Sequence, residues 1–324
     1  NNDVNRLNGL LKQTQDLNQR ISAASNQGKP TASLEDLRQT TVDEIAEIIP
    51  IRQVPRERDT VALFTPGGAI LLDGNAAEIG FTTTNVIVPH MTQQGGLLSG
   101  LTVNDVPIRT EAVTGPLNGG SLGANFQIRD ELAVSAQTQI DAVARNLAER
   151  LQDPAVDPTL GAADPGLFTD NGLAFSDLNE VGFSGRMTLN ASIDPNSGGA
   201  VWRLRDGLGA AFSGDVGNAT LLLGMSAAIS EPQTISSGDF GMANRSTSGF
   251  SAQFVTQISG ALQVSEQDLS FATAHLSGLK ALELSDGVDS DQELQNLLLI
   301  EQTYDANAKV IQAVDEMLQS LMRL

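Results

Sequence analysis

The feature that most restricts the fold of this chain is a narrow apolar stripe along its C-terminal segment. Apolar side chains recur there every three or four residues, at an average step close to the 3.5 residues of a coiled coil. A helix with one narrow stripe gains most of its stability by packing that stripe against another helix. We therefore predict a terminal coiled-coil helix over residues 286–324 that offers an interface to a partner. The predicted interface residues are Leu297, Ile300, Tyr304, Ala308, Ile311, Val314, Leu318 and Leu321.

The start of this helix carries a capping signal. Ser290 and Glu293 stand at the first and fourth positions of a capping box. The serine hydroxyl can accept a hydrogen bond from the N3 amide, and the Glu293 carboxylate can accept one from the amide of Ser290. These two residues are therefore predicted to form the helix cap.

Helical periodicity also marks the other end of the chain. Residues 1–49 are predicted to form paired helices, over about 1–25 and 33–49, because apolar residues recur there at three- and four-residue steps. Gly28 and Pro30 break the pattern between the two helices. This arrangement predicts a helical hairpin or a bent rod.

The pattern changes to short strands over residues 50–125. Short apolar runs at 61–64, 69–72 and 86–88 are separated by glycine pairs. Brief apolar runs bounded by glycine are typical of strands and turns. This segment is therefore predicted to be rich in β-structure.

Two further helices are predicted in the second half of the chain. Helical spacing over residues 126–152 indicates a central helix, which the Asp153-Pro154 pair ends. Residues 153–185 are rich in Gly, Pro and Asp, which indicates loops. A long helix is predicted over residues 238–285. Its apolar residues are Phe250, Phe254, Ile258, Leu262, Leu269, Ala272, Leu276 and Leu279.

These elements predict an α+β fold that is mainly α. The N- and C-terminal segments would form an elongated helical rod, with a β-rich portion inserted between them. Residues 1–285 would be the rod domain and residues 286–324 the terminal coiled-coil helix. Aromatic residues make up only 4% of the chain, which fits helix-on-helix packing better than an aromatic-rich sandwich.

Charge and composition exclude several classes of function. The net charge is −20, from 19 basic and 39 acidic residues, so the surface repels nucleic acid and anionic lipid. The chain has no cysteine, which excludes disulfides and thiolate chemistry. No apolar run reaches the ~18 residues needed to span a bilayer. We therefore expect neither a nucleic-acid partner nor a membrane partner.

No residue pattern indicates catalysis. His90 and His275 are the only histidines, and neither stands in a metal-binding or triad spacing. Carboxylates are abundant in so acidic a chain, so their positions in the sequence do not single out an acid–base pair. We predict no catalytic, cofactor-binding or metal-binding residue, and hence no enzyme.

The C-terminal helix carries a family signature as well as a stripe. The positions Gly287-Val288, Glu293, Gln302, Tyr304 and Val310-Ile311 resemble the C-terminal motif of the flagellar hook-associated protein 1 family. The family has a Glu-Glu pair where this chain has Gln292-Glu293, and Glu293 keeps the capping role. This motif is typical of flagellar axial proteins as a class.

Three other stretches agree with the same family. Leu17–Ile21, followed by Gly28 and the run Leu34–Arg38, resembles its paired helices, and this run distinguishes the family from flagellin. Residues 120–129 resemble the segment that leads into its central helix. The helix over 250–282 matches the family's penultimate helix in length and position. Together these resemblances cover most of the chain.

The resemblance implies a structural subunit of the bacterial flagellum that joins hook to filament and polymerises through its terminal helices. It also implies motility as the process served, an extracellular location and secretion through the flagellar type III export apparatus. The implied partners are copies of the chain in a ring, the hook protein, other hook-associated proteins, and an export chaperone that binds the C-terminal helix. No cofactor is implied.

The resemblance further implies that the chain is N-terminally truncated and lacks the N-terminal partner of the last helix. Larger family members carry a separate outer β domain after the central helix, and we expect that domain to be absent or vestigial here. Two alternatives stay open. The chain could be another axial protein, such as the third hook-associated protein or a flagellin, or a secreted adhesin or binding module.

Overall fold

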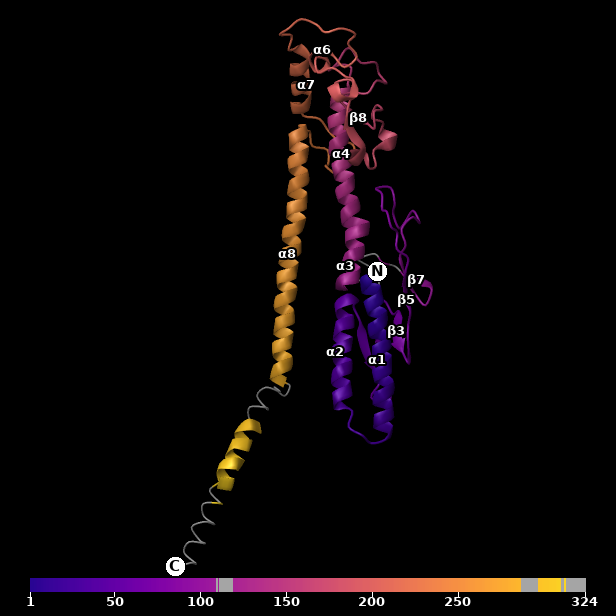
Figure 1. Ribbon diagram of the computed structural model, residues 1–324, viewed down its shortest axis with the longest axis vertical. Helices are drawn as coiled ribbons and strands as arrows, with labels where there is room; N and C mark the ends of the chain where they lie inside the picture. Colours follow the sequence, from indigo (N-terminus) through magenta and orange to yellow (C-terminus); the bar gives the residue numbers. More distant parts are fainter. Residues whose placement is uncertain (109, 111–118, 287–296, 310–311, 313–324) are drawn as a thin grey trace, which may run out of the picture. The chain divides into compact units, whose positions relative to one another are not determined.

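The computed structural model describes residues 1–108, 110, 119–286, 297–309 and 312 (Figure 1). The chain divides into two compact units, Asn1–Val255 and Thr256–Leu324. Helices dominate the described residues, and the strands form small antiparallel sheets. This confirms the predicted class, α+β and mainly α.

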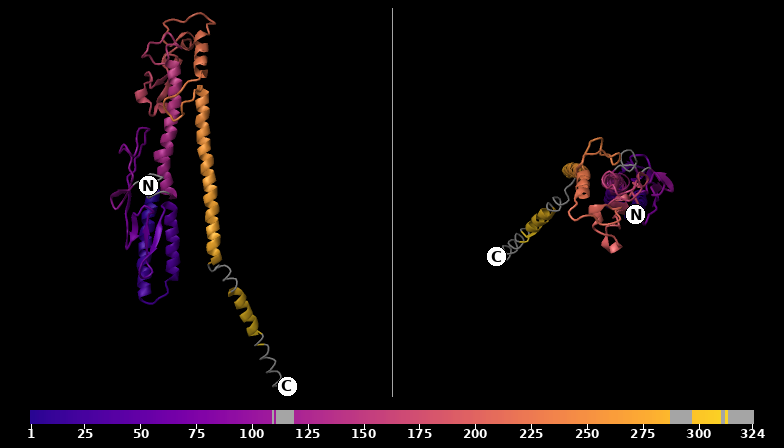
Figure 2. Two further views of the ribbon diagram at one scale, coloured as in Figure 1. Left: turned by 180° about the vertical axis from the view of Figure 1, so that it is seen from behind. Right: turned by 90° about the horizontal axis from the view of Figure 1, so that it is seen from above.

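The first two helices lie side by side in the first unit (Figures 1 and 2). Helix α1 spans Asn2–Asn26 and helix α2 spans Ala32–Ile48. The chain reverses between them at Gly28, whose φ of +67° is a conformation that glycine adopts readily. Leu7 of α1 and Ile45 of α2 are fully buried in one shared core.

Four short strands follow α2 and form an antiparallel sheet in the order β1-β2-β3-β4. Leu63 and Leu72 face each other across the two middle strands and are fully buried in the core that α1 and α2 share. Among the described residues, strand β1 pairs only with β2, so its outer edge is open there. The bounds are β1 Arg52–Pro55, β2 Val61–Phe64, β3 Ile70–Asp73 and β4 Asn75–Ala76.

A second antiparallel sheet has the order β5-β6-β7, with β5 at Ile79–Phe81, β6 at Leu101–Val103 and β7 at Val106–Ile108. The predicted strand at residues 86–88 is wrong, because this run is irregular and Val86 is 70% exposed. An apolar run forms a strand only where a neighbouring strand can pair with it, and this run has none among the described residues.

A nearly continuous helical stretch forms the centre of the first unit. It consists of α3 (Gly120–Gln127), a π-helical turn (Ile128–Leu132) and α4 (Ala133–Gln152). The predicted start at residue 126 is therefore too late. The first turn of α3 contains glycines, which are poor helix formers, so the sequence pattern does not indicate it. Leu122 and Phe126 are buried in the shared core and hold that turn in place.

Residues 153–246 connect α4 to the long helix mainly through loops and short elements. Small apolar clusters along α4 hold these loops, such as the cluster of Ala148, Phe175 and Phe183. The short elements are β8 (Phe168–Asp170), a 3-10 turn (Asp177–Asn179), α5 (Phe183–Arg186), β9 (Met187–Leu189), a second 3-10 turn (Pro195–Ser197), α6 (Arg203–Asp206) and α7 (Thr220–Ser230).

The long helix α8 spans Thr247–Asp286, so the predicted start at residue 238 is too early. Gly238, Asp239 and Gly241 all have positive φ angles and turn the chain before the helix begins. In the first unit, Phe250 of α8 is fully buried against Phe240 and Ala142. The second unit holds the rest of α8 and a further helical segment over residues 297–309.

Candidate functional site

The C-terminal interface predicted from the sequence lies partly within the described residues. Leu297, Ile300, Tyr304 and Ala308 stand in the helical segment 297–309 and are exposed. Tyr304 is 76% exposed, so its ring contacts little of the chain. The other predicted residues lie outside the described part of the chain: Ser290, Glu293, Ile311, Val314, Leu318 and Leu321.

Helix α8 also presents apolar side chains to solvent in the second unit. Leu262, Leu269 and Leu276 recur every seven residues and are more than half exposed. Ile258, four residues before Leu262, and Leu279, three residues after Leu276, extend this face at coiled-coil spacing. A monomeric soluble protein rarely exposes a continuous apolar face of this kind, which marks it as a contact surface.

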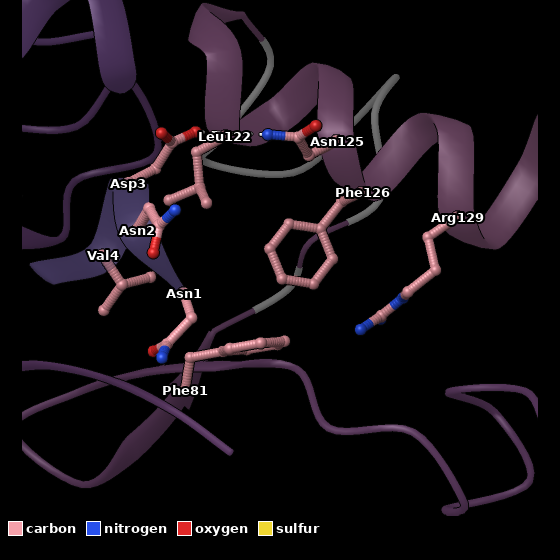
Figure 3. Close-up of a pocket in the computed structure, with 9 residues that line it drawn as sticks. All are labelled: Asn1, Asn2, Asp3, Val4, Phe81, Leu122, Asn125, Phe126 and Arg129. Carbon is pink, nitrogen blue, oxygen red and sulfur yellow. Dashed lines mark hydrogen bonds between the residues drawn. The ribbon is translucent and has the colours of Figure 1, made fainter. Parts of the chain in front are cut away.

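A separate hollow of about 480 Å³ lies where α1, α3 and β5 meet (Figure 3). Its floor is apolar, because Leu122 and Phe126 are buried there. The ring of Phe81 meets the ring of Phe126 edge-on, with centroids 5.9 Å apart. The remaining lining residues are Asn1, Asn2, Asp3, Val4, Asn125 and Arg129.

The polar groups around this hollow are engaged in holding its walls together. One carboxylate oxygen of Asp3 accepts hydrogen bonds from the Ser121 hydroxyl at 2.9 Å and the Asn125 amide at 3.1 Å. The Arg129 guanidinium lies 4.7 Å from the centre of the Phe126 ring and pairs with Asp130. These contacts fix α1 against α3, so the hollow can bind an apolar group but holds no acid–base pair.

A buried arginine joins α4 to the C-terminal end of α7 and to the segment just before α8. Arg150 is 3% exposed and donates to the carbonyl oxygens of Ala228, Glu231 and Arg245. Its Nε also donates to the side-chain oxygen of Asn146 at 2.8 Å. Burial lowers the pKa of this guanidinium, and the carbonyl dipoles at the end of α7 compensate its charge. Sequence spacing gave no signal for this residue.

An ion cluster lies on another face of α4. Arg145 pairs with Glu149 at 2.9 Å, Glu180 at 2.8 Å and Asp177 at 3.3 Å. Burial raises the pKa of the Glu149 carboxyl, and the nearby Asp177 raises it further, while Arg145 opposes both effects. Arg145 and Glu149 line a cavity of about 550 Å³ together with the loop around Phe240. The ion pairs of the cluster fasten the segment 177–180 to α4.

The histidines and carboxylates of the described residues form no metal-binding group. His90 is exposed, and His275 stacks on Phe271 of the same helix with ring centroids 6.3 Å apart. Within that part, no three His, Asp or Glu side chains are placed to bind a metal ion. No described helix is long and apolar enough to cross a membrane.

Two family models match the chain. Residues 1–153 match the model described as "Flagellar hook-associated protein FlgK helical domain", which covers α1 to α4 with the sheets between them. Residues 281–324 match the model described as "Flagellar basal body rod FlgEFG protein C-terminal". A search of curated proteins gave no match.

One solved structure with detectable similarity is the flagellar hook junction protein FlgK from Burkholderia pseudomallei. It shares 19% sequence identity with this chain, with a TM-score of 0.36. The match covers 53% of this chain and 30% of that protein. This chain thus spans less than one third of the length of that protein.

Proposed function

Because the chain is a FlgK-like flagellar hook-associated protein, we propose that it is the structural subunit that joins the hook of the bacterial flagellum to the filament. The family matches at both ends of the chain support a role in the flagellar axis. In this proposal the chain performs no reaction. It connects two assemblies by polymerising through its terminal helices.

The observation that carries the proposal is the exposed apolar surface of the C-terminal helices. Leu262, Leu269 and Leu276 of α8 and Ile300 and Tyr304 of the last described helix all face solvent. Burial of such surface contributes about 25 cal/mol for each Å² of apolar area, before the costs of ordering and association. Pairing of this apolar surface with other helices is therefore favourable, and neighbouring subunits of the assembly provide those helices.

The proposed partners follow from the family. Copies of this chain form a ring, one side of which contacts the hook protein and the other side further hook-associated proteins. Before export, a chaperone covers the C-terminal helix, including Leu297, Ile300, Tyr304 and Ala308. The chain then leaves through the flagellar type III export channel and takes its place outside the cell.

The domain organisation is also a proposal. Residues 1–285 form the rod domain, and residues 286–324 form the terminal coiled-coil helix that pairs with helices of the assembly. A separate outer β domain is absent or vestigial. This is supported by the short elements at residues 153–246, where the described part contains one two-stranded sheet, β8–β9.

Electron microscopy of cells that lack the gene tests the proposed function. We expect hooks without filaments and flagellin released to the medium, with filaments restored by the full-length gene. A variant with Leu262, Leu269 and Leu276 all changed to Ser should fail to restore them, although it is expressed and helical. Normal filaments in the deletion strain would contradict the proposal and favour an adhesin or binding module.

A further inference from the structure

Helix α2 presents an acidic stripe to solvent. Asp36, Asp43 and Glu47 are exposed and lie on one side of the helix, because steps of seven and four residues return to the same face. This face points away from Val42 and Ile45, which are buried in the core. Residues 32–48 carry five acidic residues and one basic residue, a net charge of −4.

The edge strand β1 and the turn after it carry the opposite charge. Residues 52–58 hold three arginines and one glutamate, a net charge of +2 in a chain whose total is −20. Arg52 and Arg56 flank a hollow of about 290 Å³ that is also lined by Val54 and Phe64. The Arg56 guanidinium lies 5.8 Å from the centre of the Phe64 ring.

Two of these three arginines have no charged partner among the described residues. Arg56 pairs with Asp73 at 2.8 Å. The guanidinium groups of Arg52 and Arg58 make no hydrogen bond or ion pair with any described residue. On α2, Glu44 and Glu47 lie near Arg6, whereas the carboxylate of Asp36 makes no such contact with the described residues. Arg52, Arg58 and Asp36 therefore have no oppositely charged partner among the described residues, whereas Glu47 of the stripe has Arg6 nearby.

We propose that the acidic stripe of α2 docks on the β1 edge of a second copy of this chain. The stripe is Asp36, Asp43 and Glu47, and the β1 edge is Arg52, Arg58 and the hollow over Phe64. Leu37, beside the stripe, is 46% exposed and is the apolar side chain that the hollow receives.

A second copy fits because both patches belong to the same chain. A contact between two different patches of identical subunits is heterologous, and repetition of such a contact gives a ring or a helical array. Complementary charge steers the encounter and fixes the register of neighbouring subunits. The inference rests on the proposed function, since it names the surfaces through which copies in the junction meet.

Cysteine cross-linking tests the contact directly, because the chain contains no cysteine of its own. Two full-length copies with different tags, one carrying Asp36→Cys and the other Arg58→Cys, are produced in flagellated cells and treated with a short bis-maleimide. We expect cross-linked pairs that contain both tags. Cells in which both copies carry Asp36→Cys, or both carry Arg58→Cys, should give at most traces. Cross-links in those cells at the same yield would overturn the proposal.

Reversal of the charges on the two patches is a second test of the contact. Arg52→Asp with Arg58→Asp should weaken association about tenfold, because two attractive pairs become repulsive. Asp36→Lys with Asp43→Lys should do the same, and a chain with both reversals should associate normally. Glu78→Lys, at an exposed site outside both patches, is the matched control. Failure of the combined reversal to restore association would contradict the pairing.

The failures of the two proposals are distinguishable. If deletion of the gene abolishes filaments but the mixed cross-link never forms, the docking inference fails and the junction function stands. If filaments are normal without the gene, the junction function fails. In that case, the cross-link between purified full-length copies tests the docking of the two patches independently of the junction function.

Discussion

Arg150 offers a quantitative test of how the first unit is held together. Its guanidinium reaches three backbone carbonyl oxygens, those of Ala228, Glu231 and Arg245, and the side chain of Asn146. The first two carbonyls lie at the end of α7, and the third lies just before α8. One buried cation therefore ties α4 to the ends of two later helices.

Substitution of Arg150 by Met keeps much of the volume and removes every one of these donors. A buried acceptor left without a partner costs about 1–3 kcal/mol. The Arg245 carbonyl also accepts a hydrogen bond from the Gln233 amide, so the loss falls mainly on two carbonyls, which water will reach in part as the loops relax. We therefore expect the free energy of unfolding to fall by about 3–5 kcal/mol. Arg150→Lys should lose less, because it keeps the charge and part of the hydrogen bonding.

Urea unfolding followed by far-UV circular dichroism measures this change. The control is Arg20→Met, since Arg20 is on the surface of α1 and makes only an exposed pair with Asp16. That control should stay within about 0.5 kcal/mol of the parent. Hydrogen exchange of the amides around Phe250 should also accelerate in Arg150→Met. A loss below about 1 kcal/mol, with exchange unchanged, would refute this expectation, because it would mean that the carbonyls of Ala228 and Glu231 are readily hydrated.

Three further substitutions test other parts of the structure. Gly120→Ala should destabilise the fold by about 2 kcal/mol or more in thermal unfolding, because φ at Gly120 is +71° and a Cβ would lie 2.4 Å from the Ile48 carbonyl oxygen. Gly9→Ala is the matched case, since nothing lies within 4 Å of its Cβ position, and it should stabilise α1 by about 0.5–1 kcal/mol. Glu149→Gln should leave the protein at least as stable at pH 7. The pKa of the Glu149 carboxyl is raised in the folded chain, so the folded chain holds this proton more tightly and stability from this group is gained as pH falls. The stability advantage of Glu149→Gln over the parent should therefore vanish below the ordinary carboxyl pKa of 4.5. Urea unfolding measured across pH tests this. An advantage that grew on acidification would contradict the expected direction of the pH dependence.

The helical parts of the fold could be predicted because their periodicity is long and regular. Helix α1 repeats apolar residues over its whole length, and the observed bounds Asn2–Asn26 lie within a residue or two of the sequence pattern. The start of α3 could not be predicted, since Gly119 and Gly120 are poor helix formers and only packing of Leu122 and Phe126 on the core holds that turn. Tertiary contacts outweighed local propensity at this point.

Short strands were harder to predict, because pairing rather than composition decides them. Residues 86–88 are more apolar than β1 (Arg52–Pro55), yet only β1 has a neighbouring strand to pair with. The long-range polar contacts of the fold could not be predicted from the sequence either. Arg150 meets carbonyls more than 70 residues away, and no sequence spacing indicates such a contact.

The apolar stripe of the C-terminal helix could be predicted, because its spacing alone defines it. Of its predicted residues, Leu297, Ile300 and Tyr304 stand exposed on a described helix, as an assembly surface requires before assembly. What covers this surface depends on partners, which no pattern within the chain specifies. The interface therefore stays a prediction.

The position of the protein on the intact flagellum would show whether it joins hook to filament. Gold-labelled antibody against an epitope tag, placed in the loop around residue 216, would be imaged on flagella still attached to cells. The tag site is suitable because Val216 is 96% exposed. We expect label confined to a narrow zone where hook meets filament. Label along the whole filament, or over the cell surface away from flagella, would contradict it.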